Sequence, residues 1–374
     1  MSTTGLESLR GPGNPGCWRS RVTVCLLSMA ACRAKRTANC FTTDSPSRPI
    51  REVWWMNEAR YLAVEERLWA SVGVTPTERS LPLAHNHVTV RVQETGDGPP
   101  VVFIHGANTS GLSWAALVAR MRGFRCILVD RPGTGLSEAL SEPLDAESLP
   151  RLADTLVVDV LDALGLPSAH VVGNSYGGYI ALRTAAAHPD RVDRVVLFSW
   201  PAGAETDRVP FFMRLAGIPG LSRLSVALPP SERMVRFLFR SMGHGPSLAA
   251  GRLEKDVEAY LGLVRYTDTM RNELSPARVF VSPLRGLDRV LLPDETVRRI
   301  TAPVYLLWGE NDPFGGAEAA RRLNDLLPNA ELELMAGAGH APWLDDVEHC
   351  ADVANAFLAR TGIGGPPSSA PPIG

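Results

Sequence analysis

The sequence predicts an α/β fold, in which helices cover both faces of a mostly parallel sheet and a helical segment interrupts the sheet-forming part of the chain. Short apolar runs, typical of strands buried on both faces, alternate with helical stretches over residues 87–200 and again after residue 301. Between residues 201 and 300 this alternation stops, and apolar clusters recur at helical spacing among several prolines. We therefore expect an α/β core with a helical insertion.

The strands are expected in a regular order along the chain. Residues 87–92 alternate polar and apolar side chains, which predicts a half-exposed strand. Apolar spacing from Leu152 to Leu164, with Pro150 near its start and Gly165 at its end, predicts a long helix. The other predicted strands are the apolar runs 100–104, 125–129, 169–173, 194–198, 303–308 and 331–334.

The composition is that of an ordinary globular protein. Hydrophobic residues make up 45% and charged residues 21% of the 374 positions, and the formal net charge is -2. This balance gives no electrostatic reason to expect nucleic acid or an anionic membrane as partner. No apolar stretch approaches the roughly 20 residues that a membrane-spanning helix requires. The sequence therefore predicts a small-molecule partner and no membrane span.

The two ends of the chain differ from the rest. Residues 19–32 combine two arginines with a short apolar run and resemble a secretory or lipoprotein signal. Glu7 and a Gly/Pro-rich start argue against that reading, so we expect residues 1–55 to be a disordered leader and the protein to be cytoplasmic, with export as the alternative. The tail 361–374 is rich in Pro, Gly and Ser and is predicted to be disordered.

The expected organisation is a core formed by residues 56–200 and 301–360, with a helical cap at residues 201–300. Cysteines are concentrated in the leader, where their spacings of eight, seven and eight match no zinc-ligand pattern. Cys126 and Cys350 fall in a predicted strand and a predicted helix, where free buried thiols are expected.

The most informative motif is Gly-Asn-Ser-Tyr-Gly-Gly at residues 173–178. It directly follows the apolar run 169–172 and precedes a small-residue helix starting at Tyr179. A serine on such a strand–turn–helix connection is lifted out of the sheet, and its small neighbours let the tight backbone pass the adjacent elements. Ser175 is therefore the candidate nucleophile.

A serine nucleophile needs a base, and the base needs an orienting acid. His340 lies in a small-residue turn after the last predicted strand, which makes it the candidate base. Asp312 follows the strand 303–308 and is the candidate acid, with Glu310 as the runner-up. His349, on the predicted last helix, is interpreted as a surface residue.

The oxyanion formed in such chemistry needs backbone donors. One is expected from the Tyr176 N–H, directly after the nucleophile, and the other from the Ala107 N–H in the loop after residue 104. His105 in the same loop is interpreted as structural. The glycine-spaced turn at residues 130–137 lacks Gly-Lys-Ser/Thr, so a nucleotide-binding loop is not expected there.

Together these motifs resemble the α/β-hydrolase superfamily over roughly residues 80–360. The resemblance implies a mostly parallel sheet of the eight-stranded type, a helical cap between the sixth strand and the acid-bearing strand, and no cofactor. Ser175 stands where some relatives carry aspartate, which argues against haloalkane dehalogenase and epoxide hydrolase chemistry. The matching pieces are His105, Gly106, the Asp130 to Ser137 turn, Ser175, Asp312, Gly339 and His340.

Within that superfamily, the turn around Ser175 is similar to that of the meta-cleavage-product hydrolases, which cut carbon–carbon bonds in dienoic acids. Those enzymes usually carry Ser-Gly-Pro-Gly after the His-Gly pair, whereas this chain has Ala-Asn-Thr-Ser-Gly. The aromatic residue after the histidine is also displaced, to Trp343. These departures favour hydrolysis of a small carboxylic ester through an acyl-enzyme, with carbon–carbon hydrolysis as the alternative.

Some members of this superfamily bind ligands and turn over little, and others are lyases or perhydrolases. The complete set of Ser175, Asp312 and His340 favours an enzyme over a receptor. Substrate identity, acyl chain length and oligomeric state stay open.

Overall fold

The computed structural model describes residues 57–206, 208–210, 214, 218, 229–282, 286–287 and 291–360. The leader 1–55 with its signal-like segment and four cysteines, and the tail 361–374, lie outside the described residues. So does the apolar cluster 211–213 of the cap. Among the described residues, no helix combines the length and the apolar character needed to cross a membrane.

One mixed sheet organises the core, and its strand order is β1-β2-β4-β3-β5-β6-β9-β10. The first three strands in this order pair antiparallel, and every later pair is parallel. This confirms the predicted eight-stranded, mostly parallel α/β architecture. The strands are β1 Thr77–Leu83, β2 Val88–Thr95, β3 Pro100–Ile104, β4 Arg125–Val129, β5 Ala169–Asn174, β6 Val192–Phe198, β9 Val304–Gly309 and β10 Ala330–Met335.

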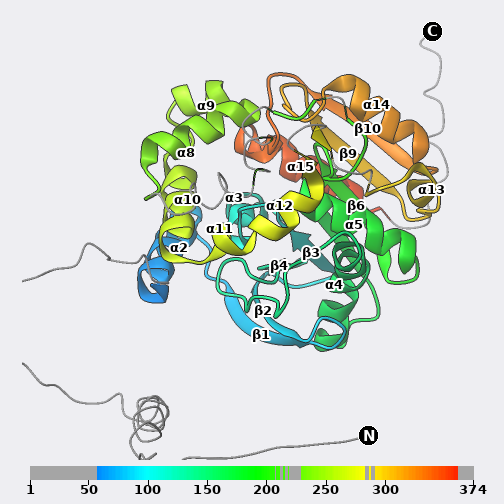
Figure 1. Cartoon of the computed structure of the whole chain (residues 1–374), viewed down its shortest axis with the longest axis horizontal. Helices are drawn as coiled ribbons and strands as arrows, with labels where there is room; N and C mark the ends of the chain where they lie inside the picture. The colour runs from blue at the N-terminus through cyan, green and yellow to red at the C-terminus, as the bar shows by residue number, and fades with distance from the viewer. Residues whose placement is uncertain are drawn as a thin grey trace, which may run out of the picture. The chain divides into compact units, whose positions relative to one another are not determined.

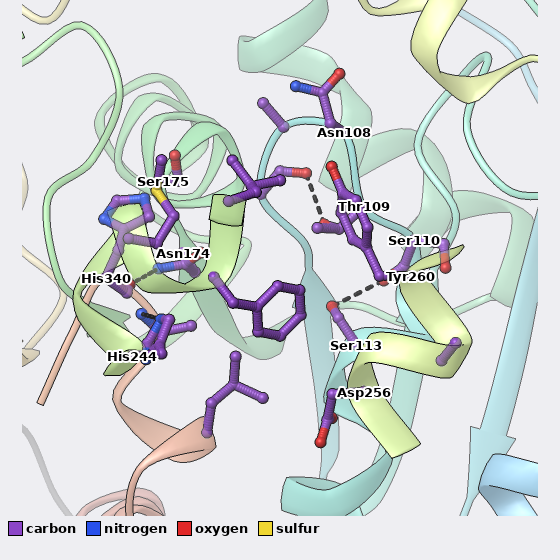
Figure 2. A pocket seen from close by; sticks show the side chains of 18 of the residues that line it. Asn108, Thr109, Ser110, Ser113, Asn174, Ser175, His244, Asp256, Tyr260 and His340 are labelled. Atoms are coloured by element: carbon purple, nitrogen blue, oxygen red, sulfur yellow. Dashed lines mark hydrogen bonds between the residues drawn. The ribbon is translucent and has the colours of Figure 1, made fainter. Parts of the chain in front are cut away.

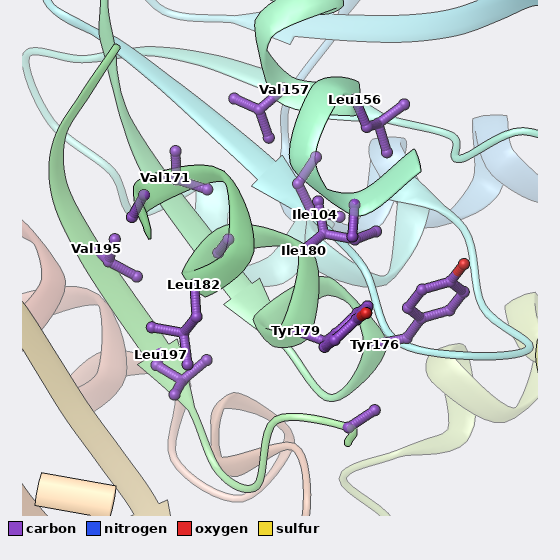
Figure 3. Close-up of a cluster of buried hydrophobic side chains, with 14 of the residues drawn as sticks. Ile104, Leu156, Val157, Val171, Tyr176, Tyr179, Ile180, Leu182, Val195 and Leu197 are labelled. Atoms are coloured by element: carbon purple, nitrogen blue, oxygen red, sulfur yellow. The ribbon is translucent and has the colours of Figure 1, made fainter. Parts of the chain in front are cut away.

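Helices cover both faces of this sheet (Figure 1). Strand β3 shows the alternation: Val102 and Ile104 belong to the cluster that includes α4 and α5, whereas Val101 and Phe103 belong to the cluster on the opposite face. Figure 3 shows the first of these clusters. The helices of the core are α2 Glu58–Val72, η2 Gly111–Trp114, α3 Ala115–Val118, α4 Ser148–Leu164, α5 Tyr176–Ala187, α14 Ala317–Leu326, η4 Pro342–Leu344 and α15 Val347–Leu358.

Between β6 and β9 the chain forms a group of short helices and one small hairpin, β7 Val281–Ser282 with β8 Gly286–Leu287. We call residues 201–300 the cap. Among the described residues of the cap, the helices are α8 Glu232–Phe239, the π-helical turn η3 Arg240–His244, α9 Gly245–Ala249, α10 Glu254–Tyr266, α11 Thr269–Asn272, α12 Leu274–Phe280 and α13 Asp294–Val297. Helices α8 and α10 lie near α2, whereas α12 extends toward α5 (Figure 1).

Candidate active site

Ser175 lies on a strained turn between β5 and α5. Its backbone has φ 53° and ψ -117°, a conformation that L-residues rarely adopt. The neighbouring glycines are required by close approach: a Cβ on Gly177 would lie 1.9 Å from the Ile104 carbonyl oxygen, and one on Gly173 would lie 2.7 Å from the Gly177 carbonyl oxygen. The sequence therefore holds Ser175 at the carboxyl end of the central strand, where parallel α/β sheets place their functional residues.

Asp312 and His340 come from neighbouring parallel strands, β9 and β10, and the loops that follow these strands bring them together. His340 Nδ1 lies 3.0 Å from Asp312 Oδ2, in a place where both residues are buried. Asp312 also accepts the Trp200 N–H at 3.0 Å and the Phe314 N–H at 2.9 Å, so its carboxylate is fixed. Glu310, the runner-up acid, is exposed.

Ser175 and His340 line the same cavity of about 190 Å³ (Figure 2). Their side chains are not hydrogen-bonded to each other in this structure; catalytic pairs of this kind commonly tighten only when substrate binds. The turn and the histidine loop are joined directly, because the Asn174 side-chain amide donates to the His340 carbonyl and to the Phe198 carbonyl, each at 2.8 Å. Ser175 and His340 thus meet at one cavity, and Asp312 reaches it through its hydrogen bond to His340.

The segments that carry the two candidate oxyanion donors both lie next to Ser175. Tyr176 begins α5, and the loop after β3 passes close to the serine, because a Cβ on Gly106 would lie 3.3 Å from Ser175 Cβ. Within the described part of the chain, neither the Ala107 N–H nor the Tyr176 N–H donates to another protein group. Both are available to a ligand atom near Ser175.

His105 is completely buried and bonded on both sides of its ring. Its Nδ1 lies 2.8 Å from the Gly106 carbonyl oxygen, and its Nε2 accepts the Arg131 N–H at 3.1 Å. Burial, with the nearby Arg131 charge, holds the pKa of His105 well below its usual value. The ring is therefore neutral, and these bonds tie together the loops after β3 and β4.

A second histidine–carboxylate pair, which the sequence did not point to, holds the His340 loop. His244 of the cap pairs with Asp345 at 2.8 Å, and its Nε2 accepts the Ala341 N–H at 3.3 Å. Asp345 Oδ2 accepts the Gly339 N–H at 2.8 Å. The His340 N–H itself donates to the carbonyl of Met242 at 2.9 Å. Three consecutive amides, those of residues 339–341, are thus fixed from outside their loop.

The cavity wall is mainly apolar, with Phe239, Met242 and Leu263 from the cap facing Trp343 from the core. Among the described residues that line the cavity there is no lysine or arginine, and Asp256 is the one carboxylate. Burial raises the pKa of Asp256 to about 6. No cluster of three or more His, Cys, Asp or Glu side chains able to hold a metal occurs in the described residues.

Comparison with known proteins assigns the family. The α/β hydrolase fold family matches residues 99–347, and the chain belongs to that family. A 2-hydroxy-6-oxononadienedioate/2-hydroxy-6-oxononatrienedioate hydrolase of Burkholderia vietnamiensis is 29% identical over 279 residues, which cover 72% of this chain and 91% of that protein.

Solved structures share the fold. The meta-cleavage product hydrolase of Pseudomonas fluorescens IP01 gives a TM-score of 0.59 at 21% identity and covers 75% of this chain and 96% of its own. Naproxen esterase of Bacillus subtilis gives a TM-score of 0.60 at 20% identity, with 80% and 97% covered.

Proposed function

We propose that this chain is a serine hydrolase that cleaves an acyl bond through a covalent acyl-enzyme. The observation that carries the proposal is the buried Asp312–His340 hydrogen bond at the cavity that also holds Ser175. The Asp312 carboxylate accepts a hydrogen bond from the Nδ1–H of His340, which leaves Nε2 free to act as the base.

The reaction then follows from these groups. Ser175 Oγ attacks the substrate carbonyl carbon while its proton passes to His340. The anionic oxygen that forms is stabilised by the N–H groups of Ala107 and Tyr176. Collapse expels the leaving group, which takes the proton from His340, and water activated by the same ring hydrolyses the acyl-enzyme.

Two substrate classes are supported by different observations. The Burkholderia relative supports carbon–carbon hydrolysis of a meta-cleavage-type dienoate, and we take such a dienoate as the first substrate to test. The departures in the sequence favour an ester instead. An ester is the second candidate. A dienoate carboxylate would find no Lys or Arg among the described cavity residues, whereas an uncharged ester needs none.

The test compares kcat/KM for a 2-hydroxy-6-oxo-dienoate ring-fission product and for p-nitrophenyl butyrate, with Ser175→Ala as the blank. A higher value for the dienoate supports carbon–carbon hydrolysis, and a higher value for the ester supports the second candidate. Turnover of either substrate that survives in Ser175→Ala would contradict the proposed nucleophile.

A further inference from the structure

A buried ion pair links the cap to the loop that carries Ala107. Glu273 lies between α11 and α12, and Arg131 follows β4. The two side chains, only 4% and 3% exposed, meet through two bonds, of 3.1 Å from Arg131 Nη1 to Glu273 Oε1 and 2.8 Å from Nη2 to Oε2. This is the planar, two-armed geometry in which arginine binds carboxylates most strongly.

The pair also binds the backbone on both sides of Ala107. Arg131 donates to the His105 carbonyl at 3.2 Å and to the Gly106 carbonyl at 3.0 Å. Glu273 Oε2 accepts the Asn108 N–H at 2.9 Å, on a residue held at φ 57°. The Asn108 N–H is thereby occupied, whereas no protein group accepts the neighbouring Ala107 N–H.

The same guanidinium contacts the residue that carries the second donor. Arg131 Cζ lies 4.1 Å from the centroid of the Tyr176 ring, and that ring packs edge-to-face against Phe280 of the cap at 5.1 Å. One buried group therefore touches both segments that supply the candidate oxyanion donors. No motif in the sequence pointed to Glu273, whereas Arg131 lies in the Asp130 to Ser137 turn that matches the superfamily.

We propose that Glu273 and Arg131 are positioning residues, which aim the Ala107 N–H at the oxyanion and make the cap part of the catalytic machinery. This inference rests on the proposed function. A buried ion pair is a weak source of stability, because desolvating both charges offsets most of their attraction. Oxyanion donors, in contrast, act only when they are held in place before the reaction.

The experiment replaces both charged side chains at once. Proteins often tolerate an apolar pair of similar volume in place of a buried ion pair, whereas removal of one partner leaves the other charge buried and unpaired. The full-length Arg131→Met/Glu273→Leu variant is compared with wild type in three measurements: thermal unfolding, the rate of fluorophosphonate labelling, and the inhibition constant of an aliphatic trifluoromethyl ketone. The serine adduct of that ketone carries an anionic oxygen, so its affinity reports on the donors. A purely structural pair would change unfolding alone.

Thr269→Val is the matched control. Thr269 is a buried cap residue whose hydroxyl accepts the Gly135 N–H at 3.0 Å, so it also joins cap to core but contacts neither Ala107 nor Tyr176. We expect the double variant to unfold cooperatively, to label at least about tenfold more slowly and to bind the ketone at least about tenfold more weakly. The control should stay within about twofold of wild type in both measurements.

A folded double variant that labels and binds like wild type would overturn the proposal. If the double variant does not fold, Arg131→Lys decides. Lysine keeps the positive charge beside Glu273 but lacks the second terminal nitrogen, which in arginine donates to the Gly106 carbonyl. Slower labelling of this variant supports the proposal, and unchanged labelling overturns it. Failure of the wild type itself to label would instead contradict the proposed function, and the positioning role with it.

Discussion

The imidazole of His340 donates from Nδ1 to Asp312 Oδ2 over 3.0 Å, although 28 positions separate the two residues in the chain. Parallel pairing of β9 with β10 brings their following loops together, and the Trp200 and Phe314 amides fix the carboxylate. With Nδ1 as the donor, Nε2 is left as the acceptor on the ring. This relationship is the basis of the proposed chemistry.

Asp312→Asn is expected to lower kcat by about 10⁴-fold, because an amide at that position favours the wrong tautomer of His340. Thermal unfolding should change much less than activity. The measurement is kcat on the better of the two substrates, with the unfolding midpoint of each variant. Glu310→Gln is the matched control, since Glu310 is an exposed carboxylate of the same turn. A severe loss in Glu310→Gln with a mild loss in Asp312→Asn would assign the acid to Glu310.

His244→Ala is expected to lower both stability and kcat. The change removes the acceptor of the Ala341 N–H and one partner of Asp345, and an unsatisfied buried polar group costs about 1–3 kcal/mol. His349→Ala is the control, because His349 pairs with Glu333 at a partly exposed site away from the cavity. Urea unfolding and kcat check both variants. Equal changes of stability and kcat in the two variants would contradict a particular role of the His244 contacts in holding the His340 loop.

Gly177→Ala is expected to prevent correct folding, since the added Cβ would meet the Ile104 carbonyl at 1.9 Å and nothing there can move without breaking the sheet. Gly165→Ala is the comparison. Gly165 has φ 67° at the end of α4 but open space around it, so its change should cost only about 1 kcal/mol. Soluble yield and thermal unfolding report both. A well-folded Gly177→Ala would contradict the close packing at the turn.

Removal of residues 1–55 is expected to leave activity and unfolding unchanged, because α2 begins at Glu58 with Asn57 as its N-cap. Removal of residues 1–73 should destabilise the protein. That deletion takes away α2, whose Glu65 forms a buried pair with Arg91 and whose Arg67 binds Glu258 of the cap. Thermal unfolding of the two truncations makes the comparison. Loss of activity in the shorter deletion would show that the leader contributes to the fold or the site.

Much of the core could be predicted from hydrophobic runs alone. Strands β3 and β4 match their predicted ranges because continuous apolar sequences are required where a strand is covered on both faces. Strand β1 was not predicted: it lies at the edge of the sheet, its first four residues are exposed, and Pro82 interrupts it. The strand expected at residues 87–92 is longer, and most of its side chains are buried, because its valines pack in the cluster with α4 and Arg91 pairs with Glu65 of α2.

The candidate site was predictable to the extent that it follows strand ends. Ser175 directly follows β5, and Asp312 and His340 lie in the loops after the parallel strands β9 and β10, so topology alone gathers them. His244 and Glu273 could not be predicted, because cap helices have no fixed relation to the sheet and both residues act through long-range contacts. Glu273 stands among other polar residues and His244 stands between two glycines, so neither is distinguished in the sequence.

The most direct test of the central claim is intact-mass labelling with a fluorophosphonate, comparing the wild type with Ser175→Ala. The account predicts a single adduct on the wild type and none on the variant, because only a serine with an assembled base and oxyanion site attacks phosphorus at a useful rate. No adduct on the folded wild type, or an equal adduct on Ser175→Ala, would contradict the assignment of Ser175 as the activated nucleophile.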